Sequence, residues 1–212
     1  MPITATATTP RPGASDITGT NRVFYNALWR RARLERAEGF NTWPLVSELL
    51  PSAMTRLEIG PGLRPRLPIA GTHFIDISAP VIEQLNARGG IGTADAVATL
   101  PFRDGQFDLV CAFDVIEHVE DDQRVFREVT RVLKGDGILI CSVPLYAELW
   151  TAFDDWVGHA RRYDPSDLLA ILSSHHIPHF TRRGLEGCIP NAALFSRIKW
   201  LPAMIASKSE GS

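Results

Sequence analysis

The chain has 212 residues, of which 45% are hydrophobic and 22% are charged, and its formal net charge is −2. This length fits one domain with a sizeable core, and the charge gives no reason to expect nucleic acid as a bulk electrostatic partner. No apolar run reaches the length of a membrane span, and the three cysteines lack the spacing of a zinc site or a disulfide framework. We therefore expect a globular, cytoplasmic protein.

The amino-terminal region is predicted to start with a flexible tail over residues 1–20, which is rich in Thr, Ala and Pro and has no apolar core of a secretory signal. Apolar residues at helical spacing then predict a helix within residues 21–39. A second, short helix is expected over residues 45–50, because Pro44 suits a first helical position and Pro51 ends the helix. These two helices would open a domain that spans residues 21–190.

Residues 52–180 alternate predicted strands with predicted helices, which indicates an α/β fold with a Rossmann-like, doubly wound and mostly parallel sheet. The connection between Gly62 and His73 is too short for a full helix, and it contains two prolines. The first crossover helix is therefore expected to be abbreviated. The predicted strands cover residues 56–59, 73–77, 92–94, 107–112 and 138–142, and the predicted helices cover 79–88, 122–134 and 165–174.

The ends of the first two predicted strands together indicate a nucleoside site. The first strand ends in the turn Gly60-Pro61-Gly62, where the backbone can pass close to a ligand because a glycine has no Cβ. The second strand ends in Asp76, sixteen residues after Gly60, and a carboxylate there can accept both hydroxyls of a ribose.

The next two strand ends add two candidate contacts. Asp95 follows the third strand, where its carboxylate can accept a hydrogen bond from the exocyclic amine of an adenine. Phe113 follows the fourth strand and can pack on a ligand or on a sulfonium. Capping of a turn is the alternative role for Asp95.

With these motifs in order, the sequence resembles the class I S-adenosylmethionine-dependent methyltransferases, and in particular the type 11 domains that act on small molecules. The resemblance implies S-adenosylmethionine as the cofactor. One departure is that Arg64 and Pro65 stand where the family usually continues with a third glycine and a helix. The runs that carry the resemblance are Leu57–Gly62, Phe74–Ser78, Ala94–Asp95, Leu100–Phe102, Phe107–Ala112 and Arg131–Gly137.

The resemblance also assigns roles to residues at the carboxyl edge of the predicted sheet. It implies that the first strand end faces the methionine moiety, the second the ribose, the third the adenine and the fourth the amino-acid end of the cofactor. In that order the implied cofactor-binding residues are Glu58, Gly60 and Gly62, then Asp76 and Ile77, then Asp95 and Ala96, then Ala112 and Phe113.

A polar cluster after the fourth strand has three open interpretations. In a helical turn, Asp114, Glu117 and His118 share a face, and His159 lies in a later connection where a substrate lid would sit. In the first interpretation, His118 or His159 is a general base, and these two are the predicted catalytic residues. In the second, all four side chains bind a divalent metal, which is similar to an arrangement in some quinone and small-RNA O-methyltransferases. In the third, they are structural and pair with nearby arginines. Of the three, the metal site is the alternative, and no bound metal is predicted.

The same late connection holds the candidate substrate residues. Arg161, Arg162 and Tyr163 can bind a carboxylate or phosphate of a substrate, because a guanidinium directs two donors at one anion. Salt bridges to nearby aspartates are the alternative. Trp156 would supply an apolar wall, with ordinary packing as its alternative.

Residues 191–212 are predicted to form a carboxy-terminal amphipathic tail, in which apolar and basic residues alternate. Such a segment can contact a membrane surface or a lipid-like substrate, and packing against the domain is the alternative.

We therefore predict an S-adenosylmethionine-dependent methyltransferase that acts on a small molecule by in-line methyl transfer, with no nucleic-acid partner. A non-catalytic nucleoside-binding partner protein is one alternative. An NAD(P)-dependent reductase is another, although the glycine turn lacks the Gly-x-Gly-x-x-Gly pattern of such enzymes.

Overall fold

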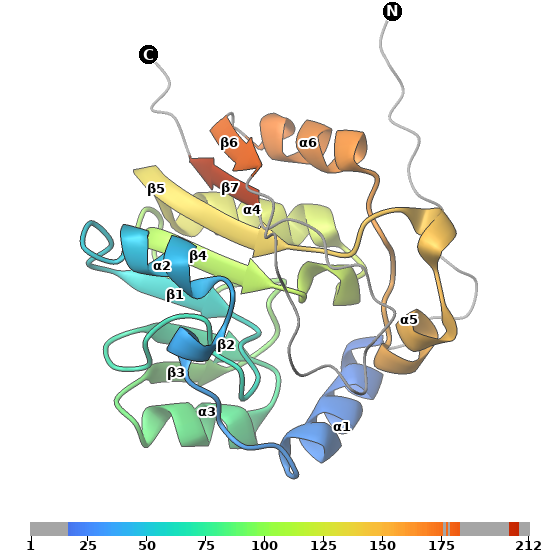
Figure 1. The fold of residues 1–212 in the computed structure, drawn as a ribbon, viewed down its shortest axis with the longest axis horizontal. Coiled ribbons are helices and arrows are strands. Elements are labelled where there is room, and N and C mark those ends of the chain that lie inside the picture. Colours follow the sequence, from blue (N-terminus) through green and yellow to red (C-terminus); the bar gives the residue numbers. More distant parts are fainter. Residues whose placement is uncertain (1–16, 176, 178, 183–203, 208–212) are drawn as a thin grey trace, which may run out of the picture.

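The computed structural model describes residues 17–175, 177, 179–182 and 204–207. Within these residues, seven strands form one sheet in the order β3-β2-β1-β4-β5-β7-β6, with helices on both of its faces (Figure 1). The strands are β1 (Arg56–Ile59), β2 (His73–Asp76), β3 (Ile91–Ala94), β4 (Phe107–Phe113), β5 (Leu133–Ser142), β6 (His179–Arg182) and β7 (Met204–Ser207). The α-helices are α1 (Ile17–Trp29), α2 (Trp43–Leu49), α3 (Ala79–Asn86), α4 (Asp122–Val132), α5 (Ala152–Val157) and α6 (Pro165–Ser174).

Strands β1 to β5 pair in parallel, and β7 pairs antiparallel with both β5 and β6. The sequence-based prediction of a mostly parallel, doubly wound sheet is confirmed. Parallel strands need crossover connections, so the carboxyl ends of β1 to β4 all reach one edge of the sheet.

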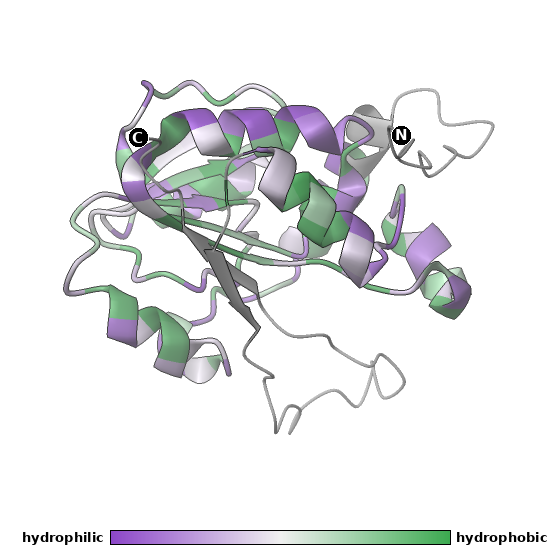
Figure 2. Cartoon of the chain, turned by 90° about the horizontal axis from the view of Figure 1, so that it is seen from above, coloured by the Kyte–Doolittle hydropathy of each residue, from purple (hydrophilic) through white to green (hydrophobic). Residues whose placement is uncertain are grey.

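The two faces of the sheet have separate hydrophobic layers. On one face, Leu57 of β1 and Val110 of β4 pack with residues of α4 and α6. On the other face, Leu109 of β4 packs with residues of α2, and Phe74 of β2 packs with residues of α3. Figure 2 shows hydrophobic and hydrophilic residues on the same helices, as expected for helices that cover a sheet.

Side chains that cap helix ends set several boundaries. The Asp121 carboxylate accepts a hydrogen bond from the Arg124 amide at the start of α4 (2.9 Å), and Asp164 accepts one from the Ser166 amide at the start of α6 (2.8 Å). Helix α5 begins with a capping box made by Thr151 and Asp154. Each cap satisfies backbone N–H groups that have no partner within the helix.

The first crossover is abbreviated, as predicted. No helix lies between Ile59 and His73, and the connection is held by the buried Glu58 carboxylate, which accepts hydrogen bonds from the amides of Arg66 (2.8 Å) and Leu67 (2.9 Å). A side chain of the first strand thus satisfies backbone groups that a helix would otherwise pair.

The prediction for the amino-terminal region was wrong in its bounds. Helix α1 includes residues 17–20, which were predicted as tail, and it ends at Trp29 well before residue 39. The following segment contacts the glycine turn instead, because the Glu35 amide donates to the Leu63 carbonyl (2.9 Å). Most of the predicted tail, residues 1–16, lies outside the described residues.

Three other predictions need correction. The helix predicted over 122–134 ends at Val132, because Leu133 pairs with Phe107 and already belongs to β5. Helix α5 was not predicted at all. Residues 204–207, part of the predicted amphipathic tail, form strand β7, whereas residues 191–203 and 208–212 lie outside the described residues. In the described part of the chain, no helix has the length and apolar character needed to cross a bilayer.

Candidate functional site

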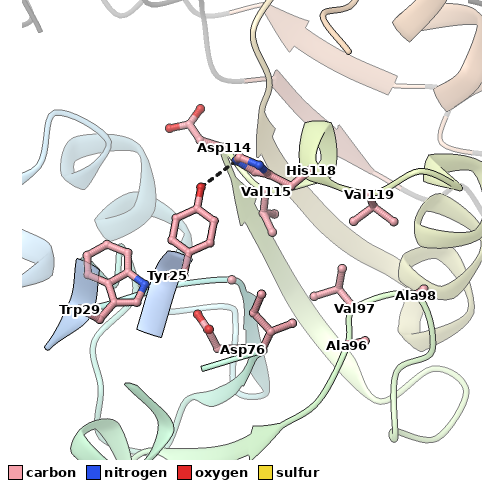
Figure 3. Close-up of a pocket in the computed structure, with 12 residues that line it drawn as sticks. Tyr25, Trp29, Asp76, Ala96, Val97, Ala98, Asp114, Val115, His118 and Val119 are labelled. Carbon is pink, nitrogen blue, oxygen red and sulfur yellow. Dashed lines mark hydrogen bonds between the residues drawn. The ribbon is translucent and has the colours of Figure 1, made fainter. Parts of the chain in front are cut away.

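A pocket opens at the edge where the first four strands end (Figure 3). The strand register places Ile59 beside both Ile75 and Ala112, so Gly60 and Asp76 and the residues after Phe113 meet at this edge. The empty volume is about 700 Å³, including the part open to solvent. This size suits a nucleoside-sized ligand. Its lining consists of Tyr25, Trp29, Gly60, Asp76, Ile77, Ala96, Val97, Ala98, Asp114, Val115, His118 and Val119.

The two glycines after β1 lie directly under other side chains. Gly60 and Gly62 have φ angles of +62° and +55°, a region that favours glycine. A Cβ on Gly60 would lie 2.5 Å from the Val115 side chain, and one on Gly62 would lie 2.2 Å from the Trp29 ring. Both positions therefore require glycine, although only Gly60 lines the pocket.

Asp76 lies in the pocket with an organised carboxylate. Its two oxygens accept hydrogen bonds from the amides of Gly62 (3.0 Å) and Ser78 (2.8 Å). Burial raises the pKa of Asp76 to about 6, against the lowering effect of these two bonds. Each carboxylate oxygen has a further lone pair, so the side chain retains acceptor capacity for a ligand. Ile77 lines the pocket next to it.

Glu58 lies below the glycine turn and is not among the residues that line the pocket. Burial raises the pKa of Glu58 to about 7, although its two amide donors act in the opposite direction. The structure thus gives this carboxylate a role in holding the crossover between β1 and β2.

The end of β3 contributes three small residues to the pocket. Ala96, Val97 and Ala98 line it, whereas Asp95 is exposed and its own carboxylate accepts a hydrogen bond from the Ala96 amide (2.7 Å). This contact corresponds to the turn-capping alternative for Asp95.

The end of β4 presents Asp114 and Val115 to the pocket, while Ala112 and Phe113 are buried beside it. Asp114 has a φ of +53°, which is uncommon for a residue with a side chain and is often found at functional positions. The Ser142 hydroxyl donates to Oδ1 of Asp114 (2.8 Å). Burial raises the pKa of this carboxyl, although the charges of Arg66 and Arg64 act against the rise.

Helix α1 covers the pocket with two aromatic rings. Tyr25 and Trp29 lie four residues apart on one face of the helix, and their rings stack with centroids 6.3 Å apart. The Tyr25 hydroxyl lies 3.1 Å from Nε2 of His118, so it connects α1 to the turn after β4. Burial raises the pKa of Tyr25, and so do the charges of Glu117, Asp76 and Asp114.

His118 reaches the pocket from a 3-10 turn at Ile116–His118. Its Nδ1 lies 3.1 Å from the Gly158 carbonyl oxygen. Because a carbonyl oxygen can only accept a hydrogen bond, Nδ1 carries the proton and donates it. Nε2 then has a lone pair, which accepts the Tyr25 hydrogen bond. Burial and the neighbouring His159 lower the pKa of His118 to about 3, so the imidazole is neutral at physiological pH.

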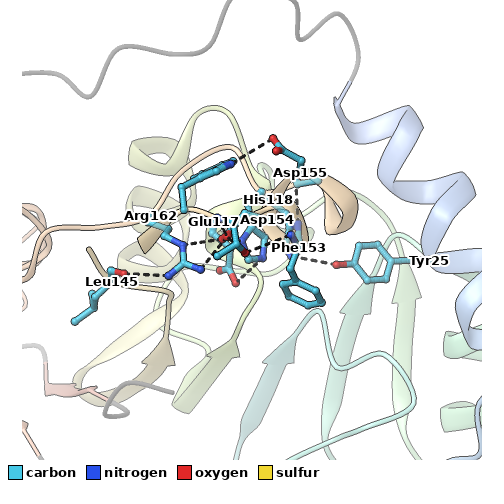
Figure 4. Close-up of polar contacts among 12 residues, drawn as sticks. Tyr25, Glu117, His118, Leu145, Phe153, Asp154, Asp155 and Arg162 are labelled. Atoms are coloured by element: carbon cyan, nitrogen blue, oxygen red, sulfur yellow. Dashed lines mark hydrogen bonds and ion pairs between the residues drawn. The ribbon is translucent and has the colours of Figure 1, made fainter. Parts of the chain in front are cut away.

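Glu117, His118, Asp154 and Arg162 lie together in a buried polar cluster (Figure 4), and His159 belongs to this cluster through its contacts with Asp154 and His118. The ring centroids of the two histidines are 4.7 Å apart. Nδ1 of His159 contacts Oδ1 of Asp154 (2.8 Å), and Arg162 binds both oxygens of Asp154 (2.7 and 2.8 Å). Hydrogen bonds from Arg162, Thr151 and His159 hold the pKa of Asp154 below its ordinary value despite burial, so Asp154 is ionised.

Glu117 completes this cluster and has an unsatisfied oxygen. Its side chain is 1% exposed, and Oε1 lies 3.8 Å from Nε2 of His159. Oε2 is buried and has no hydrogen-bond partner among the described residues. Burial raises the pKa of Glu117 well above its ordinary value, and the charges of Asp114 and Asp154 add to the rise.

Three side chains of this cluster are arranged as metal ligands would be. One ligand atom from each of Glu117, His118 and His159 lies within 4.8 Å of the others. In both histidines Nδ1 contacts a hydrogen-bond acceptor, which is the Gly158 carbonyl for His118 and the Asp154 carboxylate for His159. Metal-binding histidines usually use their second ring nitrogen in this way. Asp114, the fourth predicted ligand, is not in the group and accepts a hydrogen bond from Ser142 instead.

The candidate substrate residues all have internal contacts. Arg162 is buried on Asp154, Arg161 pairs with Asp122 (2.6 Å), and the Tyr163 hydroxyl donates to the same Asp122 (2.9 Å). These contacts correspond to the salt-bridge alternative. Trp156 is 58% exposed and packs edge-on against Phe24 of α1, with the ring centroids 5.1 Å apart.

Sequence reasoning did not identify the residues that cover the pocket. Tyr25 and Trp29 are spaced as one face of a helix, which is also the pattern of ordinary core residues. Val115 and Val119 were likewise given no role. Only the tertiary contact between α1 and the strand ends distinguishes these side chains from core.

The chain is similar to methyltransferases in sequence and in fold. Residues 58–141 match a family model described as a methyltransferase domain. The chain is similar to a probable S-adenosylmethionine-dependent methyltransferase of Mycobacterium tuberculosis (36% identity over 78 residues, 36% of this chain and 28% of the relative). It is also similar to the uncharacterized methyltransferase YcgJ of Bacillus subtilis (39% identity over 82 residues, 38% of this chain and 31% of the relative). The matched stretch thus spans less than a third of either relative.

A solved structure extends the similarity of fold over most of the chain. It comes from the complex between the Haloferax volcanii Trm112 methyltransferase activator and a protein described as a putative methyltransferase. The TM-score is 0.63, with 88% of this chain and 98% of that chain covered, at 16% sequence identity. The motifs at the strand ends, the family match and this fold agree with one another. Residues 58–141 thus match a methyltransferase domain, and the chain is similar to S-adenosylmethionine-dependent methyltransferases in sequence over part of its length and to a methyltransferase structure in fold.

Proposed function

We propose that this chain transfers a methyl group from S-adenosylmethionine to a small-molecule acceptor. The observation that carries the proposal is the pocket at the sheet edge, in which Asp76, the glycine turn and the small residues after β3 lie together beneath Tyr25 and Trp29. A single acidic residue at the end of β2 beside a glycine turn suits a ribose, and the small side chains leave room for a flat base.

The residues of the pocket fit the cofactor. Gly60 has no Cβ, so the Val115 side chain can pack directly against it at the pocket, and the Asp76 carboxylate is held in place by two backbone amides. We infer that Asp76 and Ile77 hold the ribose and that Ala96, Val97 and Ala98 contact the adenine. Asp95 is better suited to hold the turn that positions Ala96.

The protein's contribution to the reaction is alignment of the two reactants and exclusion of water. When bound, S-adenosylmethionine supplies a methyl group on a sulfonium, which is already activated for displacement by an acceptor oxygen, nitrogen or carbon. The acceptor gains the methyl group and loses a proton, and S-adenosylhomocysteine remains. Tyr25 and Trp29 cover the pocket and keep water out.

His118 is the residue best placed to accept a hydrogen bond from the acceptor, because its lowered pKa keeps the imidazole neutral with a lone pair on Nε2. It lines the pocket, and its Nε2 lone pair is directed at the Tyr25 hydroxyl, which an acceptor hydroxyl or amine can displace. His159 does not line the pocket, so its proposed role is to support His118 from behind through the ring contact, held by Asp154.

Calorimetric titration of the purified chain with S-adenosylhomocysteine tests this function, with NADH as a control ligand. We expect S-adenosylhomocysteine to bind and NADH not to bind. Asp76→Asn keeps the size of the side chain but removes its charge, and Asp76→Ala removes the ribose contact altogether, so both should weaken binding. Binding of NADH alone would instead support a reductase. Binding of neither ligand would support a non-enzymatic role.

A second candidate is methyl transfer assisted by a divalent metal that Glu117, His118 and His159 hold. The unsatisfied Oε2 of the buried Glu117 favours this candidate, because a buried carboxylate needs a cation, a donor or a proton. Mixed carboxylate and imidazole ligands suit manganese, iron or zinc. Titration of metal-free protein with Mn²⁺ or Zn²⁺ should then show binding that Glu117→Gln and His159→Gln each abolish, whereas Glu120→Gln should leave it intact.

A further inference from the structure

Arg66, in the connection between β1 and β2, has a guanidinium with no ion-pair partner among the described residues. The Arg66 guanidinium lies 3.9 Å from the centre of the Phe40 ring and 5.7 Å from that of Phe113. Among the described residues, it makes neither a hydrogen bond nor an ion pair, whereas the neighbouring Arg64 pairs with Glu35 (3.2 Å). A guanidinium always remains protonated, so its N–H donors stay available to an anion.

Asp114 presents the opposite charge at one end of the pocket. In Figure 3 its side chain lies at the end opposite Asp76. Within the described part of the chain, its carboxylate accepts one hydrogen bond, from Ser142, and makes no ion pair with Arg66. The two charged groups nevertheless influence each other, because Arg66 and Arg64 moderate the rise in the pKa of Asp114. Its φ of +53° is a strained conformation that brings this residue to the pocket.

The abbreviated crossover explains why an arginine is needed here. In a Rossmann-like fold the glycine turn usually leads into a helix, whose N-terminus attracts an anionic group of the ligand. In this chain no helix lies between Ile59 and His73, so that positive end is missing. The segment that replaces the helix carries Arg66, and the buried Glu58 fixes its backbone through the Arg66 amide.

We infer that Arg66 and Asp114 bind the amino-acid end of S-adenosylmethionine, with Arg66 on its carboxylate and Asp114 on its ammonium group. The inference rests on the proposed function. Arg66 contacts the ring of Phe113, which precedes Asp114 in the chain, and the two charged groups do not pair with each other. One positive and one negative group in this arrangement match the two charges of an α-amino acid, and the Phe40 ring packs against the guanidinium. The opposite end of the pocket, at Asp76, would receive the nucleoside.

Two ligands that differ only at this end test the inference. S-adenosylhomocysteine carries the amino-acid group, whereas 5′-methylthioadenosine lacks it, and calorimetry gives the dissociation constant of each. We expect Arg66→Ala and Arg66→Gln to weaken the binding of S-adenosylhomocysteine by about ten-fold to a hundred-fold, as for loss of a hydrogen bond to a charged group. Both should leave 5′-methylthioadenosine within about two-fold of the unmodified protein. Asp114→Asn should likewise weaken the binding of S-adenosylhomocysteine and leave the binding of 5′-methylthioadenosine unchanged.

Arg64→Ala is the matched control, since Arg64 stacks on the same Phe40 ring (5.3 Å) but already has Glu35 as a partner. It should change neither affinity by more than about two-fold. An unchanged affinity of Arg66→Ala and Arg66→Gln for S-adenosylhomocysteine would overturn the inference while leaving the proposed function intact. An equal loss for both ligands would also overturn it, because it would indicate a structural role. Binding of neither ligand to the unmodified protein would reject the proposed function itself.

Discussion

The Tyr25 hydroxyl and Nε2 of His118 lie 3.1 Å apart, and this contact joins the amino-terminal helix to the turn that follows β4. The same tyrosine stacks on Trp29, which lies on Gly62. A single helix thus covers both sides of the pocket, and its position depends on contacts with two strand ends that are far apart in the sequence.

Removal of the Tyr25 hydroxyl tests that connection. Tyr25→Phe keeps the stacked ring and deletes one hydrogen bond, so we expect the free energy of unfolding to fall by about 1 kcal/mol. Tyr25→Ala also removes the ring that covers the pocket, and it should in addition weaken the binding of S-adenosylhomocysteine. Denaturant unfolding and calorimetry measure the two effects. Equal affinity in Tyr25→Ala and the unmodified protein would contradict the proposed role of α1 as a cover.

Gly62 should tolerate a methyl group poorly, because two effects combine at this position. Its φ of +55° strains any other residue, and the added Cβ would lie 2.2 Å from the Trp29 ring. Gly105 has a similar φ of +59°, and no atom of the described residues lies within 4 Å of a Cβ added there, so Gly105→Ala measures the strain alone. Gly62→Ala should be less stable than Gly105→Ala and should shift Trp29. Adding Trp29→Ala to Gly62→Ala should remove most of the destabilisation that exceeds that of Gly105→Ala. If it does not, the clash with Trp29 is not the cause.

The pair formed by Arg162 and Asp154 should be costly to break. Both side chains are buried, and two hydrogen bonds of 2.7 and 2.8 Å join them. Arg162→Ala would leave an ionised carboxylate buried, so we expect a loss of about 3–5 kcal/mol in the free energy of unfolding. Arg162→Lys should recover only part of it, because an ammonium cannot bind both oxygens in the same way.

Arg127 provides the matched control for this pair. Its contact with Asp121 is long (3.8 Å), and both side chains are more than half exposed, so Arg127→Ala should cost less than about 1 kcal/mol. Similar losses in the two alanine variants, measured by denaturant unfolding, would show that burial of the Asp154 carboxylate is not what matters.

Glu58 should make stability depend on pH. Burial raises its pKa from 4.5 to about 7, so the folded state holds the proton more tightly than the unfolded chain does. This contribution to stability is fully present below about pH 4.5 and is lost as the pH rises to about 7. The stability lost between pH 5 and pH 8 should therefore be smaller in Glu58→Gln, by an amount of up to about 3 kcal/mol.

Unfolding of the ligand-free protein at these two pH values measures the effect. The raised pKa of Asp76 acts in the same direction, so the informative quantity is the difference between Glu58→Gln and the unmodified protein. Glu120→Gln changes an exposed carboxyl and should behave like the unmodified protein. The same pH dependence in all three proteins would show that Glu58 is not responsible.

Much of the fold could be predicted because its signals are local. Strand β1 and helix α6 have the predicted bounds, since an apolar run and a cap followed by proline are visible in a few consecutive residues. The abbreviated crossover followed from the prolines after Gly62. The bounds of α1 and the start of β5 depend instead on contacts with distant residues, such as Leu63 and Phe107, which no local pattern contains.

For the site, the sequence by itself determined which strand ends carry glycine, Asp76 and the small residues, because parallel strands bring their carboxyl ends to one edge. It did not decide which of several charged residues would face a ligand and which would pair internally. In the tertiary structure Arg162 pairs with Asp154 and Glu58 holds the crossover, whereas the Arg66 guanidinium has no ion-pair partner among the described residues. That choice is made by burial and by distances of a few ångströms between segments far apart in the chain, and these arise only when the chain folds.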